Sequence, residues 1–203
     1  MISVSLLNIK DNEEKIKEVD QLHSDYVHID VMDGEFVNNK IDFENLPFMN
    51  TKRDIHLMVY DIPRYIDIYS KYKPEYLTFH LEATEKVEEM IAHIKRINSK
   101  VGISICPNTK VELLLPYLAQ VDLVLIMTVE PGKGGQSFII DCAHKIDILK
   151  ELREKNHYHY KIEVDGGVNE VTKEYCKNAD ILVVGSYLTM SDNYLEKYQN
   201  MLK

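Results

Sequence analysis

Short apolar runs that alternate with helix-like stretches along the whole chain are the feature that most restricts the fold. Each run has four to six residues, is rich in β-branched side chains and mostly lacks the polar–apolar alternation of a strand with one wet face. This pattern is typical of parallel strands buried on both faces. The eight runs cover residues 2–7, 26–31, 55–59, 76–80, 101–105, 123–128, 161–164 and 181–184.

Charged stretches with helical periodicity connect these runs. We predict helices over residues 12–22, 62–72, 84–98, 109–119, 139–155, 169–177 and 194–202. Two of them begin with residues that favour a helix N-terminus, Thr109 and Asn169. Residues 32–50 are instead rich in Asn and Asp, so we predict a loop there with at most a short helix.

Eight strand-like runs joined by crossovers predict a closed α/β barrel, the (β/α)8 TIM barrel of the phosphate-binding type. A length of 203 residues is near the small end for this fold, so we expect one domain over residues 1–203. An open doubly wound sheet is the alternative. It would need a Gly-rich first turn, but Asn8-Ile9-Lys10-Asp11 follows the first run.

The composition of the chain restricts the classes of partner that the protein can bind. The net charge is −9 and there is no basic patch, which argues against nucleic acid. No stretch approaches the ~18 apolar residues of a membrane span, and the first residues lack the basic region of a signal peptide. The widely spaced Cys106, Cys142 and Cys176 fit packing roles in a reducing compartment. We therefore expect a cytoplasmic protein without a membrane partner.

Four residues with metal-ligating side chains lie at or near the ends of the predicted strands. His28 and Asp30 are two residues apart on the second run and so point the same way, His56 lies on the third run, and Asp165 ends the seventh. Barrel enzymes place their chemistry at the C-terminal ends of their strands. Burying both carboxylates without partners would cost several kcal/mol by the general rule for buried charge. A bound cation removes that cost, so the sequence predicts a site for one divalent metal ion.

The mixed nitrogen and oxygen ligands suit zinc, iron(II), manganese or cobalt, and contain too much nitrogen for calcium or magnesium. Asp30 and Asp165 also lie on well-separated strands, so they could transfer protons on opposite sides of a substrate. One would remove a proton beside a carbonyl to form a planar enediolate, and the other would return a proton to the far face. The cation would stabilise the developing oxyanion as a Lewis acid.

Turns of small residues follow the last three predicted strands. Glycine lets backbone N–H groups approach an anion, and the loops after strands seven and eight of this fold often bind phosphate. We therefore predict a sugar-phosphate site there. The turns contain Gly132, Lys133, Gly134, Gly135, Gly166, Gly167, Gly185 and Ser186.

Met32, Met58 and Met127 fall at or just after strand ends. They either pack as adaptable apolar side chains or line the pocket as a thioether surface over the enediolate. His80 ends the fourth run on the same face, and it either lines the pocket or packs there.

Four motifs in this order make the chain resemble the ribulose-phosphate 3-epimerase family over nearly its full length. They are HIDVMDG at 28–34, HLMV at 56–59, MTVEPGKGGQSF at 127–138 and EVDGG at 163–167. The resemblance implies a (β/α)8 barrel that interconverts D-ribulose 5-phosphate and D-xylulose 5-phosphate in the pentose phosphate pathway. It also implies a homo-oligomer.

The resemblance assigns roles to individual residues. It implies the metal ligands His28, Asp30, His56 and Asp165, with Asp30 and Asp165 as the catalytic acid/base pair. It implies that the ketose phosphate contacts Ser5, His56, Gly132–Gly135, Asp165–Gly167, Gly185 and Ser186.

The chain departs from the family pattern at several positions. Glu35 replaces a His, Asn38 replaces a Pro, Lys133 replaces an aromatic residue, and Cys106 replaces an Asn. None of these is a predicted metal ligand. Lys133 could change how its loop closes and so which substrate size is preferred.

Three alternatives follow. A relative in the family acts on a hexulose phosphate, so a 3-epimerase that converts D-allulose 6-phosphate to D-fructose 6-phosphate is one alternative. A non-catalytic sugar-phosphate-binding barrel would be expected to lack one of the two carboxylates, but Asp30 and Asp165 are both present. A decarboxylase on the same barrel would want a Lys beside its aspartates, but Asp30 is followed by Val31-Met32-Asp33.

Overall fold

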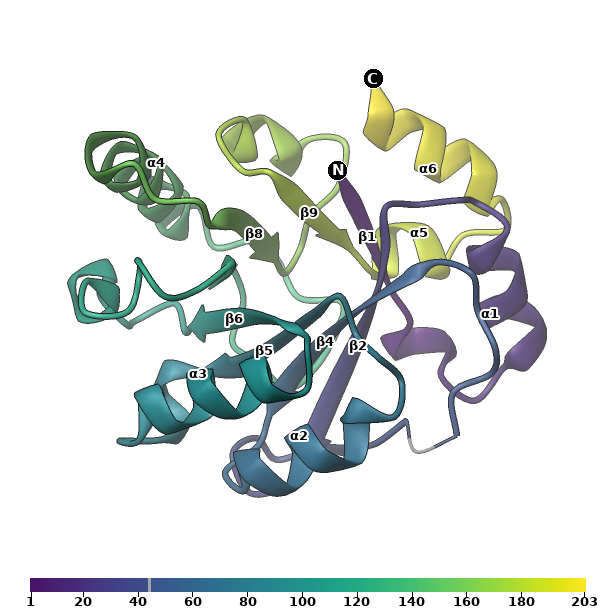
Figure 1. The fold of residues 1–203 in the computed structure, drawn as a ribbon. Helices are drawn as coiled ribbons and strands as arrows, with labels where there is room; N and C mark the ends of the chain where they lie inside the picture. The colour runs from purple at the N-terminus through teal and green to yellow at the C-terminus, as the bar shows by residue number, and fades with distance from the viewer. Residues whose placement is uncertain (44) are drawn as a thin grey trace.

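Eight parallel strands close into a barrel (Figure 1). The structure is a computed structural model that describes residues 1–43 and 45–203. Strand β1 pairs in parallel with both β2 and β9, which closes the ring, so the predicted (β/α)8 barrel is confirmed and the open sheet was the wrong alternative. The barrel strands are β1 (Ile2–Ser5), β2 (Tyr26–Asp33), β4 (Lys52–Met58), β5 (Tyr76–His80), β6 (Lys100–Ile105), β7 (Leu123–Met127), β8 (Lys161–Asp165) and β9 (Ile181–Val184).

The two faces of strand β2 differ in chemistry. Val27, Ile29 and Val31 are fully buried in the apolar core between the strands and the helices. His28 and Asp30 alternate with them and therefore point into the barrel. The outward face of β2 contributes to the hydrophobic core, which leaves its inward face free to carry polar groups.

Helices lie around the outside of the strands (Figure 1). Two of them begin at an Asn whose side chain caps the helix. Asn12 Oδ1 accepts a hydrogen bond from the Lys15 N–H at 3.0 Å, and Asn193 Oδ1 accepts one from the Glu196 N–H at 3.1 Å. The helices are α1 (Glu13–Asp20), α2 (Ile62–Ser70), α3 (Val87–Arg96), α4 (His144–Asn156), α5 (Ser186–Thr189) and α6 (Tyr194–Leu202).

The helix predicted over residues 109–119 was wrong, because only Val111–Leu114 form a 3₁₀ turn. The Thr109 hydroxyl does not cap this segment, since it donates to the Glu82 carboxylate on another crossover. Pro116 has no N–H to continue an α-helical ladder. A tertiary contact and a proline therefore replace the expected helix.

The segment 169–177 is also shorter than predicted, with a 3₁₀ helix at Thr172–Cys176. Asn169 is not its N-cap, which is Val171; instead, Asn169 Oδ1 accepts from the N–H groups of Val171 and Thr172 at 2.8 and 3.1 Å in the turn before the helix. The Thr172 hydroxyl donates to the Gly167 oxygen at 2.9 Å and ties the segment to the loop after β8.

The segment after β2 is mostly loop, as predicted, although β2 itself continues to Asp33 and a two-residue strand β3 (Lys40–Ile41) pairs antiparallel with its end. No helix forms here among residues 32–43 and 45–50, and residue 44 of this prediction lies outside the described residues.

Three further 3₁₀ turns occur in the described part of the chain, at Leu7–Ile9, Leu81–Ala83 and Ile140–Cys142. Within the described part of the chain, none of the helices combines the length and apolar character needed to cross a membrane.

Candidate active site

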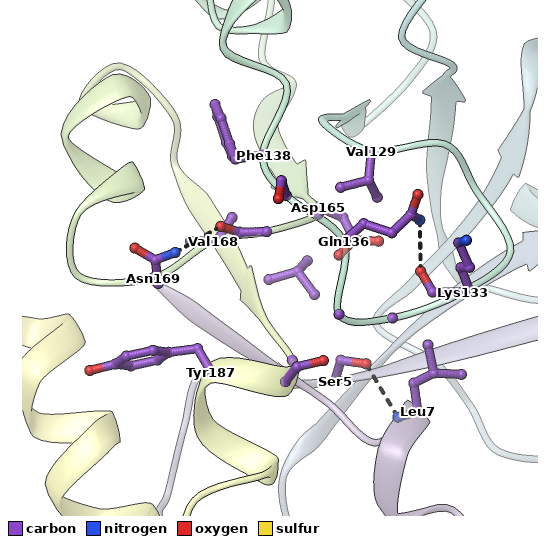
Figure 2. Close-up of a pocket in the computed structure, with 18 of the residues that line it drawn as sticks. Ser5, Leu7, Val129, Lys133, Gln136, Phe138, Asp165, Val168, Asn169 and Tyr187 are labelled. Carbon is purple, nitrogen blue, oxygen red and sulfur yellow. Dashed lines mark hydrogen bonds between the residues drawn. The ribbon is translucent and has the colours of Figure 1, made fainter.

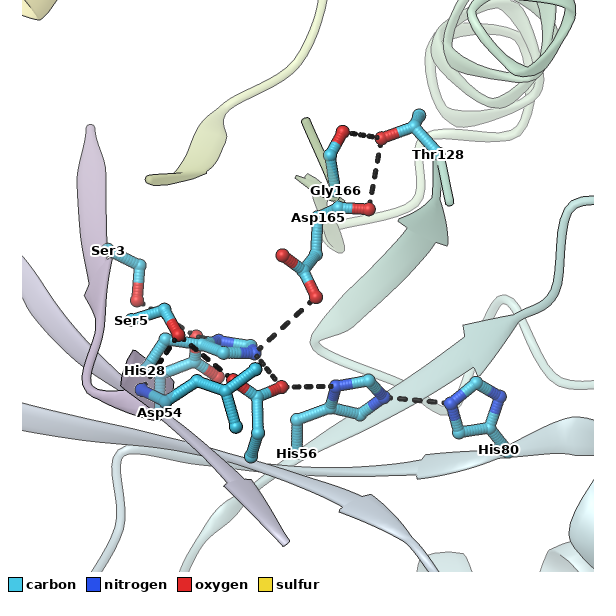
Figure 3. Close-up of polar contacts among 11 residues, drawn as sticks. Ser3, Ser5, His28, Asp54, His56, His80, Thr128, Asp165 and Gly166 are labelled. Atoms are coloured by element: carbon cyan, nitrogen blue, oxygen red, sulfur yellow. Dashed lines mark hydrogen bonds and ion pairs between the residues drawn. The ribbon is translucent and has the colours of Figure 1, made fainter. Parts of the chain in front are cut away.

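Strands β2, β4 and β8 bring the four predicted metal ligands together. Asp30 stands beside His56 in the register of β2 and β4. Asp30 Oδ1 lies 3.3 Å from His28 Nε2 and 3.4 Å from His56 Nδ1, and Asp165 Oδ2 lies 3.9 Å from His28 Nε2. One ligand atom from each residue falls within 4.8 Å of all the others. Figure 3 shows Asp165 pointing from β8 toward His28.

These residues fit a metal ion. His28 Nε2 and His56 Nδ1 are buried, have no hydrogen-bond partner and both lie close to Asp30. Buried polar atoms in proteins nearly always have a partner, so two such nitrogens beside two carboxylates indicate a place for a cation. Two imidazoles and two carboxylates suit a divalent ion of the zinc, iron(II), manganese and cobalt group.

Hydrogen bonds hold this cluster in place from the β1 side. The Ser5 hydroxyl donates to Asp30 Oδ2 at 3.0 Å. On the far side of the His28 ring, Nδ1 lies 2.6 Å from Asp54 Oδ2, which also accepts from the Ser3 hydroxyl at 3.0 Å. A carboxylate behind a ligating histidine fixes its tautomer, and here it leaves Nε2 free for the metal.

The two predicted acid/base carboxyls have opposite environments. Burial opposes ionisation of Asp30, but the neighbouring His28 and His56 together outweigh it and hold the pKa of this carboxyl well below its ordinary value. Burial and then the charge of Asp30 raise the pKa of Asp165 to about 7. Burial disfavours charge on His28 as well, yet Asp54 and Asp30 raise its pKa well above the ordinary value. A pair of carboxyls whose pKa values are pushed apart is suited to serve as one base and one acid.

Sequence reasoning missed three residues of this cluster. Asp54 and Glu163 are fully buried, and each precedes a predicted ligand by two residues on the same strand. Burial and then Asp54 raise the pKa of the Glu163 carboxyl well above its ordinary value. The two-residue periodicity that links His28 to Asp30 could have found both.

The third missed residue is Glu82, next to His80. His80 is fully buried and does not line the cavity; its Nε2 lies 2.8 Å from His56 Nε2, and its Nδ1 lies 3.2 Å from Glu82 Oε2. Burial lowers the pKa of His80 to about 4, so its ring is neutral near pH 7. Burial raises the pKa of Glu82, but the hydrogen bonds from His80, Thr109 and the Cys106 N–H together outweigh this and lower it to about 2.

A cavity of about 790 Å³ opens beside the four ligands, and Figure 2 shows Ser5, Asp165 and Tyr187 around it. Every predicted substrate-contacting residue except His56 lines it, and so do the three methionines. His28 and His56 have no exposed surface and are not among the lining residues. The lining includes Ser5, Asp30, Met32, Met58, Met127, Gly132, Lys133, Gly134, Gly135, Asp165, Gly166, Gly167, Gly185 and Ser186.

The glycines after β8 let two loops meet. Gly167 has φ +68°, and a Cβ there would lie 2.5 Å from the Phe138 nitrogen. Gly166 has φ +120°, and a Cβ there would lie 2.5 Å from Val129 Cγ2. Glycine is therefore required for both the backbone conformation and the close approach of the loops that follow β7 and β8.

The loop after β7 is also fixed by side chains. Gln136 Nε2 donates to the backbone oxygens of Glu130 and Lys133 at 2.7 and 2.9 Å, and Asn39 Nδ2 donates to the Gly132 oxygen at 2.7 Å. The Lys133 side chain lies at the exposed part of this loop and lines the cavity.

Known proteins share this sequence and this fold. A family model described as the ribulose-phosphate 3 epimerase family matches residues 1–189. A ribulose-phosphate 3-epimerase of Schizosaccharomyces pombe is 39% identical over 80% of this chain and 74% of its own length. One of Bacillus subtilis is 38% identical over 85% of this chain and 83% of its own length.

Among solved structures, KGPDC from Streptococcus mutans superposes with a TM-score of 0.70 at 11% identity, over 99% of this chain and 94% of that one. At this identity the likeness shows the barrel fold alone. The sequence matches go further, and by them the chain belongs to the ribulose-phosphate 3-epimerase family and is an isomerase.

Proposed function

We propose that this protein is a metal-dependent epimerase that inverts C3 of a ketose phosphate, converting D-ribulose 5-phosphate to D-xylulose 5-phosphate. One observation carries the proposal: Asp30 and Asp165, with oppositely shifted pKa values, converge from β2 and β8 on two buried histidine nitrogens that have no partner. The names of the sequence relatives support the substrate.

In the proposed reaction the two carboxyls act on opposite faces of C3. Asp30, whose lowered pKa keeps it ionised, removes the C3 proton, and Asp165 returns a proton to the other face. Their roles exchange in the reverse direction. The Ser5 hydroxyl orients the Asp30 carboxylate through Oδ2.

The proposed metal site uses His28, Asp30, His56 and Asp165. A divalent cation bound there would supply a Lewis acid beside the developing oxyanion. Met32, Met58 and Met127, each no more than 2% exposed, would form an apolar and polarisable wall that keeps water from the enediolate.

The phosphate is proposed to bind at the turns after β7, β8 and β9. Gly166 and Gly167 hold the positive φ angles from which successive backbone N–H groups can face an anion, and Gly185 and Ser186 line the same cavity. The Ser186 hydroxyl accepts a hydrogen bond from Asn8 Nδ2 at 2.9 Å, which fixes its position.

NMR in deuterated water tests the proposal. The protein, loaded separately with Zn²⁺, Fe²⁺, Mn²⁺ or Co²⁺, is incubated with D-ribulose 5-phosphate. We expect D-xylulose 5-phosphate that carries deuterium at C3. D-Allulose 6-phosphate is the second substrate, because Lys133 lines the cavity where the family pattern has an aromatic residue. Conversion of the hexulose phosphate alone would replace the pentulose by the hexulose in the proposal. Conversion of neither substrate would contradict the proposal.

The cytoplasmic location, the homo-oligomer and the single domain stay predictions.

A further inference from the structure

A chain of three side chains leads away from the proposed metal site on the β4 side. His56 Nε2 lies 2.8 Å from His80 Nε2, and His80 Nδ1 lies 3.2 Å from Glu82 Oε2. Both rings are fully buried, with centroids 4.9 Å apart, and the Phe36 ring covers His80 at 4.8 Å (Figure 3 shows the two histidines). We propose that His80 and Glu82 are positioning residues that fix the tautomer of His56 and so aim its Nδ1 lone pair at the cation. This inference deepens the proposed function and rests on it.

Glu82 determines which ring nitrogens of His80 and His56 carry a hydrogen. Its Oε1 accepts the Cys106 N–H at 2.8 Å and the Thr109 hydroxyl. These two donors and the hydrogen bond with His80 stabilise the ionised carboxylate and lower the pKa of Glu82 to about 2, so Glu82 is an acceptor near pH 7. The facing His80 Nδ1 must therefore carry a hydrogen, because two lone pairs at this distance would repel each other.

The positions of the other ring hydrogens follow from the number of N–H groups in a neutral imidazole. A neutral ring carries one N–H, so His80 Nε2 is an acceptor once Nδ1 is a donor. The single hydrogen between the two rings then belongs to His56 Nε2. This leaves His56 Nδ1 with a lone pair, and that nitrogen is the buried atom without a partner that lies 3.4 Å from Asp30 Oδ1.

The same residues could be taken for a second metal site, since His80, Glu82 and Cys106 each offer a ligand atom within 4.8 Å of the others. Their polar atoms are already engaged, however. Glu82 Oε1 holds two donors, and Cys106 Sγ and Glu82 Oε2 both face the same nitrogen of His80, at 3.6 and 3.2 Å. A cation at that nitrogen would displace the hydrogen on which the His56 tautomer depends. The arrangement therefore favours a hydrogen-bond relay over a second cation.

Metal affinity in matched variants tests the relay. His80→Leu fills the space without an acceptor, whereas His80→Gln can place an amide oxygen near the position of Nε2. Loss of such an outer partner typically lowers metal affinity by about 10–100-fold. We expect a loss of that size for His80→Leu and Glu82→Gln, measured by Zn²⁺ competition with a chelator, and substantial rescue in His80→Gln. Cys106→Ala is the control, because it keeps the backbone N–H that Glu82 accepts.

Nitrogen NMR of the metal-free wild-type protein supplies a readout independent of metal and of turnover. We expect His56 as the Nε2–H tautomer and His80 as the Nδ1–H tautomer. The opposite tautomers, or unchanged metal affinity in both His80→Leu and Glu82→Gln, would overturn the inference. A second Zn²⁺ equivalent that Cys106→Ala abolishes would also overturn it. If the wild type epimerises no ketose phosphate, the proposed function fails, while the tautomers still decide the relay.

Discussion

The two parts of the proposed active site would recognise a substrate by different means. The proposed metal side consists of His28, Asp30, His56 and Asp165, whose side chains meet inside the barrel beside the cavity. The proposed phosphate side consists of the turns at residues 132–135, 166–167 and 185–186, which line the cavity and offer mainly backbone groups on small residues. Charges interact strongly where little water screens them, so the metal side depends on the identity and protonation of each side chain. The phosphate side depends instead on backbone conformation.

The largest expected effect is on the metal side. Asp165→Asn removes one of the two proposed proton carriers, and we expect kcat to fall by about 10²–10⁴-fold, the usual contribution of a general acid or base. Because Asp30 remains, one epimer should still exchange its C3 hydrogen with deuterated water without inverting. Activity is measured at saturating metal, and the unfolding midpoint serves as the control for folding. Epimerisation near the wild-type rate would contradict the two-base assignment.

The protonation of the metal side should make metal affinity depend on pH. The pKa of Asp165 is raised to about 7, so below that pH an incoming cation must displace its proton. We expect affinity to fall by about a hundredfold for each pH unit between pH 7 and pH 5, the equivalent of two displaced protons, one from Asp165 and one from His28, whose pKa is also raised. Chelator competition at each pH measures it. A pH-independent affinity would show that Asp165 does not lose a proton on binding.

Metal affinity should rise with pH, whereas the stability of the metal-free protein should fall with pH. A carboxyl with a raised pKa holds a proton in the folded state that the unfolded chain releases, so Asp165 stabilises less as pH rises from about 4 to about 7. The raised pKa of His28 acts in the same direction above its unfolded value of about 6.5. We expect the thermal midpoint of chelator-treated protein to fall from pH 5 to pH 8, with a smaller fall in Asp165→Asn.

On the phosphate side, Gly167→Ala should weaken substrate binding. Its Cβ would meet the Phe138 backbone at 2.5 Å, and the backbone there has φ +68°. We expect KM to rise by about tenfold, a difference of ~1.4 kcal/mol, while metal content stays at the wild-type level. Steady-state kinetics with elemental analysis measure both. A loss of metal without a change in KM would show that the two sides are not separate.

The smallest effect is expected at Lys133, an exposed residue that lines the cavity. Its exposed ammonium can attract the substrate's phosphate, and an exposed pair of charges contributes about 0.2–1 kcal/mol. Lys133→Ala should therefore raise KM by at most about fivefold, and salt should reduce the difference. Lys133→Phe, compared on pentulose and hexulose phosphates, tests whether this position sets substrate size. An equal effect on both would exclude that role.

The positions of the main site residues were predictable because they follow from local rules. His28 and Asp30 share a strand face, and His56 and Asp165 occur near the ends of buried apolar runs, where a barrel gathers its polar groups. Asp54 and Glu163 obey the same two-residue rule. Their partners could not be foreseen, because the register that sets Asp54 beside His28 is a property of the closed sheet.

The sequence by itself determined the eight strands, the closed barrel and the cluster of ligand-type residues, because apolar periodicity and strand alternation are local properties. Only the tertiary structure determined the hydrogen bonds between segments that are distant in sequence. Thr109 donates to Glu82 instead of capping a helix, and Glu82 reaches the metal side through His80, because crossovers that are far apart in sequence pack together at one end of the barrel. Local patterns predict which side chains can ligate a metal, and long-range packing sets the hydrogen bonds behind them.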